Sequence, residues 1–208
     1  MYVILFIENN EGDFMAKLYF KYGAMGSSKT AQALITKFNY EERGMKVWLI
    51  KPSTDTRDGA DILSSRVGLS SSCDAIDKNA NILEIFKEKA SEINVIIADE
   101  SQFFTEKQID ELREIVNEYD VPVLCFGLRT DFLTRLFPGS KRLLEIADTL
   151  SEIKTMCECG AKATVSARID GTGKIITAGR QVVLGGNDRY LAMCHRCFKR
   201  RVKEQGEK

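Results

Sequence analysis

The stretch Lys17–Thr30, KLYFKYGAMGSSKT, decides the fold of this chain. Its first half, 18–22, is a short apolar segment with the composition of a β-strand, and it runs directly into a loop of small residues that ends in Lys29 and Thr30. This is the order of a phosphate-binding loop, in which backbone N–H groups surround a phosphate at the N-terminus of the next helix. In such a loop we expect Lys29 to contact the β- and γ-phosphates and Thr30 to bind Mg²⁺.

The loop departs from the usual GxxxxGK[ST] pattern at one position. The pattern places glycine immediately before the lysine, and here that residue is Ser28. Serine adopts fewer backbone conformations than glycine does. Because so short a pattern also arises by chance in ordinary strand-turn-helix corners, a second and independent element is needed.

The second element is an apolar segment that ends in two acids. Residues 94–98 show no alternation of polar and apolar side chains, as expected for a central strand covered on both faces, and Asp99 and Glu100 follow. This is the Walker-B arrangement, in which the aspartate reaches Mg²⁺ through water and a neighbouring glutamate can take a proton. Such carboxylates could merely cap a turn. Together with a lysine-bearing loop roughly 70 residues earlier, they favour nucleotide phosphate chemistry.

Strand and helix patterns alternate along the first 150 residues. Apolar segments of strand length occur at 18–22, 46–50, 94–98 and 121–126. Helical spacing fills 28–43 and 81–90, and a capping box at Thr105 and Gln108 opens a further helix. We therefore predict an α/β fold, a P-loop (RecA-like), mostly parallel sheet flanked by helices. The apolar side of helix 28–43 is expected to consist of Ala31, Leu34, Ile35 and Phe38.

Three regions are expected. Residues 1–14 form an N-terminal extension, 15–150 a nucleotide-binding domain, and 151–208 a smaller, glycine-bearing, hairpin-rich module. Two interpretations of the extension are equally favoured: Met15 is the true start, or the extension is an extra edge strand. Within the domain, residues 53–72 are rich in Ser, Asp and Gly and lack regular periodicity, which predicts a long functional or mobile loop.

Composition excludes several classes of function. With 208 residues and 44% hydrophobic content, the chain can bury one sizeable core and carry an appended module. Its 30 basic and 30 acidic residues balance, so no net field recruits nucleic acid or membrane. No apolar segment is long enough to cross a bilayer, and the apolar run 3–7 lacks the length and basic leader of a signal peptide. We expect a cytoplasmic protein that binds small ligands.

Four of the six cysteines form two close pairs around the C-terminal module. Cys157 and Cys159 have C-x-C spacing, and Cys194 and Cys197 have the C-x-x-C spacing of zinc sites. In a reducing compartment, two such pairs separated by a hairpin favour one tetrahedral structural Zn²⁺ over disulfides. The other candidate ligands are expected to lie outside this site: His195, Cys73 and Cys125.

Several motifs together resemble the zinc-bearing (type II) thymidine kinases. They are the phosphate loop, DESQFF at 99–104, GLRTDF at 127–132, LGGNDRY at 184–190 and the cysteine pairs, of which the C-x-C pair resembles the bacterial branch. Their joint order, over about residues 15–200, is more specific than any one of them. The resemblance implies transfer of the ATP γ-phosphate to the 5′-hydroxyl of thymidine, and also of deoxyuridine, giving thymidine monophosphate in nucleotide salvage for DNA synthesis. It also implies a homotetramer and feedback inhibition by thymidine triphosphate.

The resemblance further implies roles for single residues. Glu100 matches the general base and Arg57 the arginine near the transferred phosphate, although composition alone favours a solvated loop charge for Arg57. The residues implied to bind ATP are Gly23, Ala24, Met25, Gly26, Ser27, Ser28, Lys29, Thr30, Asp99 and Gln102, with Mg²⁺ on Thr30 and Asp99. Those implied to bind the nucleoside are Met25, Phe103, Leu128, Phe132, Phe137, Gln181, Val183, Gly185 and Tyr190, in part through a segment that wraps over the base.

Two other classes of function fit parts of the pattern. A nucleic-acid-associated P-loop ATPase would use the module and the basic segment 196–203 as a binding surface, but the neutral charge balance argues against it. A non-catalytic nucleotide sensor would accommodate Ser28 but leaves Glu100 without a role. ATP hydrolysis without nucleoside would mark the first, and binding without turnover the second.

Overall fold

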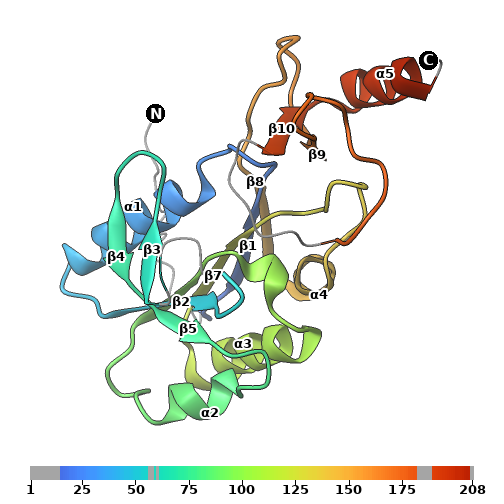
Figure 1. Ribbon diagram of the computed structural model, residues 1–208. Helices are drawn as coiled ribbons and strands as arrows, with labels where there is room; N and C mark the ends of the chain where they lie inside the picture. Colours follow the sequence, from blue (N-terminus) through green and yellow to red (C-terminus); the bar gives the residue numbers. More distant parts are fainter. Residues whose placement is uncertain (1–14, 56–58, 60, 182–188, 207–208) are drawn as a thin grey trace.

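A central parallel sheet organises the computed structural model, which describes residues 15–55, 59, 61–181 and 189–206 (Figure 1). The sheet has six strands in the order β5-β2-β6-β7-β1-β8, and the pairings between them are parallel. Their bounds are β1 Leu18–Tyr22, β2 Val47–Pro52, β5 Asp74–Ile76, β6 Val95–Ala98, β7 Val123–Gly127 and β8 Thr149–Glu152. The prediction of a mostly parallel α/β sheet is confirmed.

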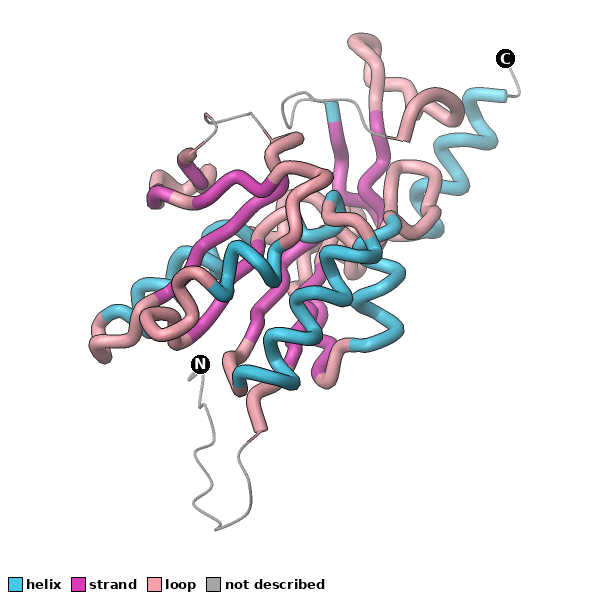
Figure 2. The backbone as a smooth tube through the Cα atoms, turned by 90° about the horizontal axis from the view of Figure 1, so that it is seen from below, coloured by secondary structure: helices cyan, strands magenta, loops and turns pink. Residues whose placement is uncertain are grey.

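Helices cover both faces of this sheet (Figures 1 and 2). One face carries α1 (Lys29–Glu41), and the other carries α2 (Ile82–Lys87), α3 (Glu106–Tyr119) and α4 (Pro138–Ile146). Leu34 of α1 packs in one buried cluster with Leu49 and Leu124, whereas Leu112 of α3 packs in another with Ile50. Because neighbouring residues of a strand enter opposite clusters, the strands read as apolar without alternation.

The start of α3 follows directly from its sequence. The Thr105 hydroxyl accepts a hydrogen bond from the Gln108 N–H at 3.1 Å, and the Gln108 side-chain oxygen accepts one from the Thr105 N–H at 3.1 Å. This reciprocal pair satisfies two N–H groups that a helix start otherwise leaves unpaired. The predicted capping box is confirmed.

The prediction of which residues form the buried side of α1 is partly wrong. Ala31, Ala33 and Leu34 are buried against the sheet, but Ile35 is 49% exposed and Phe38 is 58% exposed. Ala33 and Leu34 pack in the core with the half-buried Tyr40 against them, so the side of α1 that faces the sheet is rotated away from Ile35 and Phe38. Helical spacing identified the helix but not the width of its buried face.

The polar segment 53–72 is more ordered than its composition predicts. It contains an antiparallel hairpin of β3 (Ile62–Ser64) and β4 (Ser70–Ser72), closed by a turn in which Gly68 has φ +87°. Leu63 of β3 packs in the core, but β4 consists of three serines, so the segment carries little hydrophobic signal. The prediction of a loop without regular structure is therefore wrong for residues 62–72.

The C-terminal residues form a small module beside one end of the sheet (Figure 1). Strand β9 (Val165–Arg168) pairs antiparallel with β10 (Tyr190–Met193), and α5 (His195–Gly206) follows. Strand β8 of the main sheet spans 149–152 and so crosses the predicted boundary at residue 150. None of the helices in the described ranges has the length and apolar content that crossing a membrane requires.

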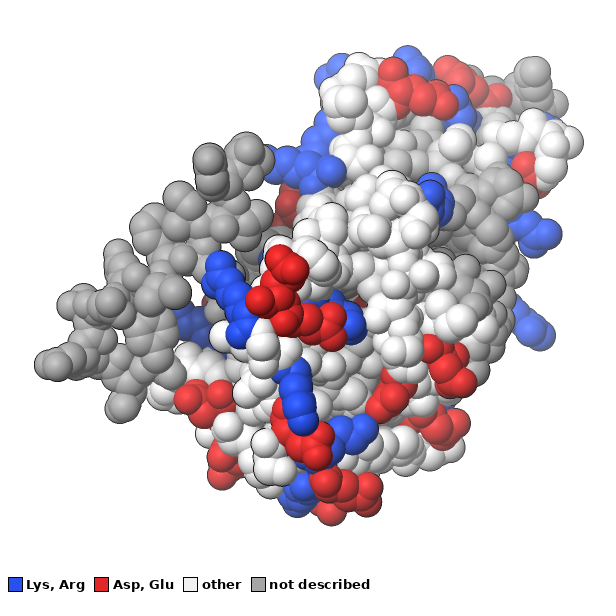
Figure 3. All heavy atoms as spheres, turned by 90° about the vertical axis from the view of Figure 1, so that its left-hand side faces the viewer, with Lys and Arg blue, Asp and Glu red and all other residues white. Residues whose placement is uncertain are grey.

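Charges are intermixed on the molecular surface. On the face seen in Figure 3, acidic and basic side chains of the described residues lie among one another rather than in separate fields. Elsewhere on the described surface, as well as on α1, charged side chains pair, for example Lys37 with Glu41 at 2.6 Å and Arg142 with Asp110 at 2.6 Å. Such exposed pairs contribute little to stability, and they leave no broad basic face in this view.

Candidate nucleotide and nucleoside site

The phosphate loop lies between β1 and α1, at the carboxyl end of the sheet. The Lys29 ammonium group donates to the Ala24 carbonyl at 2.9 Å and lies 3.4 Å from the Gly23 carbonyl. Gly23 leaves no room for a side chain, since a Cβ there would lie 2.5 Å from the Ile153 carbonyl oxygen. The loop thus curls around Lys29 at the end of a sheet where parallel α/β folds bind their ligands.

The backbone conformation of Ser28 explains why phosphate-binding loops usually have glycine at this position. Its φ of 62° and ψ of 31° are in the left-handed region, directly before the first residue of α1. A side chain in this region costs roughly 1–2 kcal/mol relative to ordinary backbone geometry. The loop therefore keeps the glycine-type conformation at this position although the residue is serine.

Ser28→Gly should raise the free energy of unfolding by about 0.5–1 kcal/mol, because the relief of left-handed strain exceeds the entropy gained by the unfolded chain. The KM for ATP should change less than about twofold, since the backbone already has the required shape. Urea unfolding and ATP titration measure both quantities. Ser72→Gly, in the exposed strand β4, is the control and should destabilise the protein. Equal destabilisation by both changes would show that Ser28 is not strained.

Thr30 and Asp99 meet beside the loop. The Thr30 hydroxyl donates to Asp99 Oδ2 at 2.7 Å, while the buried Asp99 Oδ1 has no hydrogen-bond partner among the described residues. Burial, together with the charge of Glu100, raises the pKa of Asp99 to about 7. A buried carboxylate with an unsatisfied oxygen, next to a hydroxyl, is a donor set that fits Mg²⁺.

Glu100 directly follows Asp99 and has an unusual backbone. Its φ of 48° and ψ of 33° are left-handed, and its side chain is only 8% exposed. Its carboxylate accepts a hydrogen bond from the Gln102 amide, and the Ser101 hydroxyl anchors the same turn to the Phe126 carbonyl at 2.8 Å. Residues held in strained conformations by their surroundings concentrate at functional sites.

Aromatic side chains lie beyond the ends of β6 and β7. The rings of Phe103 and Phe137 pack edge to face with their centroids 5.6 Å apart, and Leu128 is buried directly after β7. The ring of Phe132 is covered by the Arg168 guanidinium, 3.6 Å above its centroid. Such a group of rings can stack on a planar base.

The C-terminal module is joined to this aromatic group. The Gln181 amide donates to Asp131 Oδ2 at 3.0 Å, and Asp131 Oδ1 accepts the N–H groups of Leu133 and Arg135 at 2.8 and 2.9 Å. Tyr190 pairs with Arg168 across β9 and β10. Three expected site residues lie outside the described residues: Arg57, Val183 and Gly185.

Besides Asp131 and Arg168, the sequence analysis gave no role to Ser166 and Lys51. The Ser166 hydroxyl of β9 accepts the Met25 N–H of the phosphate loop at 2.9 Å. The ammonium group of the fully buried Lys51 donates to the carbonyls of Gly59 and Ile62, at 2.8 Å each. A lysine inside the apolar strand VWLIKP was a usable signal for Lys51, whereas one serine in a short polar strand gave no signal for Ser166.

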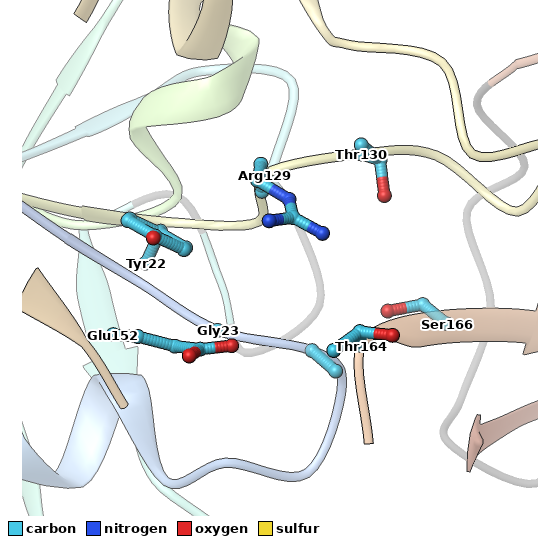
Figure 4. A pocket seen from close by; sticks show the side chains of 8 residues that line it. Tyr22, Gly23, Arg129, Thr130, Glu152, Thr164 and Ser166 are labelled. Atoms are coloured by element: carbon cyan, nitrogen blue, oxygen red, sulfur yellow. The ribbon is translucent and has the colours of Figure 1, made fainter. Parts of the chain in front are cut away.

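A small pocket marks the seam between the sheet and the module (Figure 4). The end of β1 forms one wall and the start of β9 another, and the Arg129 side chain points into the space between them. Glu152, the last residue of β8, also pairs with Lys162 at 2.5 Å. The residues that line the pocket include Tyr22, Gly23, Arg129, Glu152, Thr164 and Ser166. The pocket therefore joins the phosphate loop to the module.

The four clustered cysteines meet in the module. The sulfur atoms of Cys157, Cys159, Cys194 and Cys197 all lie within 4.8 Å of one another, and those of Cys159 and Cys194 are 3.7 Å apart. Tetrahedral zinc with Zn–S bonds of about 2.3 Å requires sulfur–sulfur distances of about 3.8 Å. This cluster could hold a zinc ion.

The protonation of the cysteines fits the same conclusion. Hydrogen bonds from the backbone of Cys159 and Cys194 lower the pKa of Cys157 to about 6, which favours its thiolate. Hydrogen bonds to the side chains of Cys159 and Cys194, in which the Cys197 thiol is the donor, raise the pKa of Cys197 to about 12 because they stabilise its protonated form. A bound cation would allow all four sulfurs to be thiolates, the form that binds zinc.

Comparisons with known proteins agree with this arrangement. The family model for thymidine kinase matches residues 16–198. Thymidine kinase of Yersinia pseudotuberculosis is 44% identical over 191 residues, which cover 91% of this chain and 97% of the relative. Thymidine kinase of Rhodopirellula baltica is 40% identical over 195 residues, covering 93% and 92% of the two chains. This chain belongs to the thymidine kinase family.

Proposed function

We propose that this chain transfers the γ-phosphoryl group of ATP to the 5′-hydroxyl of thymidine, and also of deoxyuridine, to form thymidine monophosphate from thymidine in nucleotide salvage for DNA synthesis. The observation that carries the proposal is the junction of the two motifs, where Thr30 of the phosphate loop bonds to Asp99 at 2.7 Å, one residue before Glu100. Membership of the thymidine kinase family supports thymidine as the acceptor.

In the proposed reaction, the loop residues 23–30 bind the phosphates and Lys29 offsets their charge. Mg²⁺, when bound by Thr30 and Asp99, would neutralise phosphate oxygens. Glu100 accepts the proton of the attacking 5′-hydroxyl as the new bond to phosphorus forms. We assign Arg57 to the charge on the transferred group.

The nucleoside is proposed to bind between the aromatic group and the module. The side chains of Met25, Phe103, Leu128, Phe132, Phe137 and Tyr190 would contact the base or sugar, and Gln181, Val183 and Gly185 belong to the segment that covers the base. The Gln181–Asp131 bond and the stacking of Arg168 on Phe132 support this assignment, because they bring that segment to the aromatic group.

Incubation with Mg-ATP and thymidine should give thymidine monophosphate, whereas a parallel reaction without nucleoside should consume little ATP. Product that requires thymidine supports the kinase. ATP hydrolysis without nucleoside, stimulated by DNA, would instead identify a nucleic-acid-associated ATPase. Nucleotide binding without consumption would identify a sensor.

Asp99→Asn should raise the Mg²⁺ concentration for half-maximal activity about tenfold, because the amide keeps one oxygen ligand but loses the charge. Titration of activity with Mg²⁺ measures this change. Since burial beside Glu100 already disfavours the charged form of Asp99, the variant's melting temperature should not fall at pH 8. An unchanged Mg²⁺ requirement would remove Asp99 from the metal site.

The remaining features are proposals of the same kind. A structural Zn²⁺ on the cysteine cluster, a cytoplasmic location, an N-terminal extension at 1–14 and a nucleotide-binding domain that runs from residue 15 to the end of β8, followed by the module, complete the assignment. Exposed Ile35 and Phe38 on α1 support self-association, for which we propose a homotetramer. Thymidine triphosphate carries both a base and a phosphate chain and would fit the nucleoside pocket and the phosphate loop together, which supports its role as a feedback inhibitor. Sedimentation and inhibition assays test these two points.

A further inference from the structure

Both ends of the Gln102 side-chain amide are occupied by the protein. Its nitrogen donates to a carboxylate oxygen of Glu100, and its oxygen accepts the Leu128 N–H at 2.9 Å. Gln102 is 1% exposed and lies in the short 3₁₀ helix Ser101–Phe103. The side chain therefore connects the carboxylate after β6 to the backbone after β7.

The surroundings leave Gln102 little alternative. A side chain on Gly127 would place its Cβ 2.8 Å from the Gln102 side-chain oxygen, so glycine at that position makes the bridge possible. A Cβ on Gly139 would lie 2.5 Å from the Ser101 carbonyl oxygen, which shows how closely α4 approaches the same turn. The turn is thus packed from two sides as well as hydrogen-bonded.

The bridge acts on a residue whose backbone needs support. Glu100 has left-handed φ and ψ, a conformation that is unfavourable for a residue with a Cβ atom. Such strain persists only where several contacts over-determine the conformation. Gln102 contributes one of these contacts directly at the carboxylate.

We propose that Gln102 is a positioning residue: it orients the Glu100 carboxylate and ties it to Leu128 in the wall of the proposed nucleoside pocket, rather than binding ATP. This inference rests on the proposed function, since it assumes that Glu100 is the base. It replaces the sequence-based expectation of a nucleotide contact, because both polar ends of the side chain are already bonded to the protein.

The test compares variants in two backgrounds. Gln102→Met removes both hydrogen bonds at similar volume, and Gln102→Glu keeps the acceptor for Leu128 but replaces the donor to Glu100. Each should lower kcat about 10- to 100-fold, as expected when a reacting group is misplaced. The KM for ATP and thymidine and the Kd for ATP should each change less than about threefold. In a Glu100→Gln background, the same variants should lower the residual kcat less than about threefold.

Gln108→Met is the matched control. Gln108 is also a buried glutamine, but its side chain bonds to Thr105, Asp77 and Ala80 rather than to Glu100. Gln108→Met should lower the melting temperature and leave kcat within about twofold of the value for the unmodified protein. This comparison separates general loosening of a buried amide from a specific effect on Glu100.

Three outcomes would overturn the inference. A weaker Kd for ATP would return Gln102 to the nucleotide site. Equal fold-losses with and without Glu100 would show that Gln102 does not act through it, as would unchanged kcat in both Gln102 variants. An unmodified protein that makes no thymidine monophosphate would overturn the proposed function itself, which the first assay distinguishes from failure of the positioning role.

Discussion

Glu100→Gln is expected to lower kcat by about two to four orders of magnitude, the usual contribution of a general base. The amide keeps the size of the carboxylate but cannot accept the proton of the 5′-hydroxyl. Because phosphate and nucleoside binding depend on other residues, the KM for ATP and thymidine should change less than about threefold. Initial rates of thymidine monophosphate formation over a matrix of both substrates measure these constants.

A matched variant controls for loss of a buried acid. Glu111→Gln changes a glutamate that is 6% exposed and accepts the Ile82 N–H at 2.8 Å, on the α2–α3 side of the sheet. It should affect stability more than kcat. Near-normal turnover by Glu100→Gln would remove Glu100 from the role of base, whatever the control shows.

Loss of the metal is expected to have the second large effect. Cys157→Ser with Cys194→Ser should release the zinc and lower kcat/KM for thymidine at least about 100-fold. The buried cluster of the module is small, and three of its members are cysteines of the proposed zinc site, so it cannot order the module without the metal. Disorder there would remove Ser166 from the phosphate loop and Gln181 from Asp131.

Elemental analysis and assay of the same preparations test this prediction. The unmodified chain should carry one Zn²⁺. Cys73→Ser, which changes a buried cysteine outside the cluster, should retain the metal and most of the activity. A zinc-free active protein whose Cys157 and Cys194 react freely with alkylating agents would refute the zinc assignment.

The parts of the fold that follow local rules could be predicted from the sequence. The strand before the phosphate loop, the buried strand before Asp99 and the capping box at Thr105 each depend on neighbouring residues, and the structure has all three. Their meeting also follows from a general rule, because parallel strands present their carboxyl ends at one edge. The Thr30–Asp99 contact is the result.

Features that depend on distant neighbours could not be predicted. Whether Phe38 is covered depends on which side of α1 faces the sheet, and the spacing of its apolar residues allowed more than one side. The hairpin 62–72 pairs Ile62 and Leu63 of β3 with serines of β4, so only one of its strands carries a hydrophobic signal. The contacts of Gln102 and Ser166 join segments 26 and 141 residues apart, so no local pattern reveals them.

The position of β1 has a consequence for synthesis of the chain on the ribosome. Strand β1 is flanked by β7 and β8, and the Leu18 N–H donates to Asp148, 130 residues downstream. At translation rates of about 5–20 residues per second, the strand that carries the phosphate loop waits roughly 10 s for both neighbours. Chains cut short before β8 keep one edge of β1 unpaired and would be targets for chaperones and proteases. Incomplete products are therefore expected to be removed before they can bind ATP.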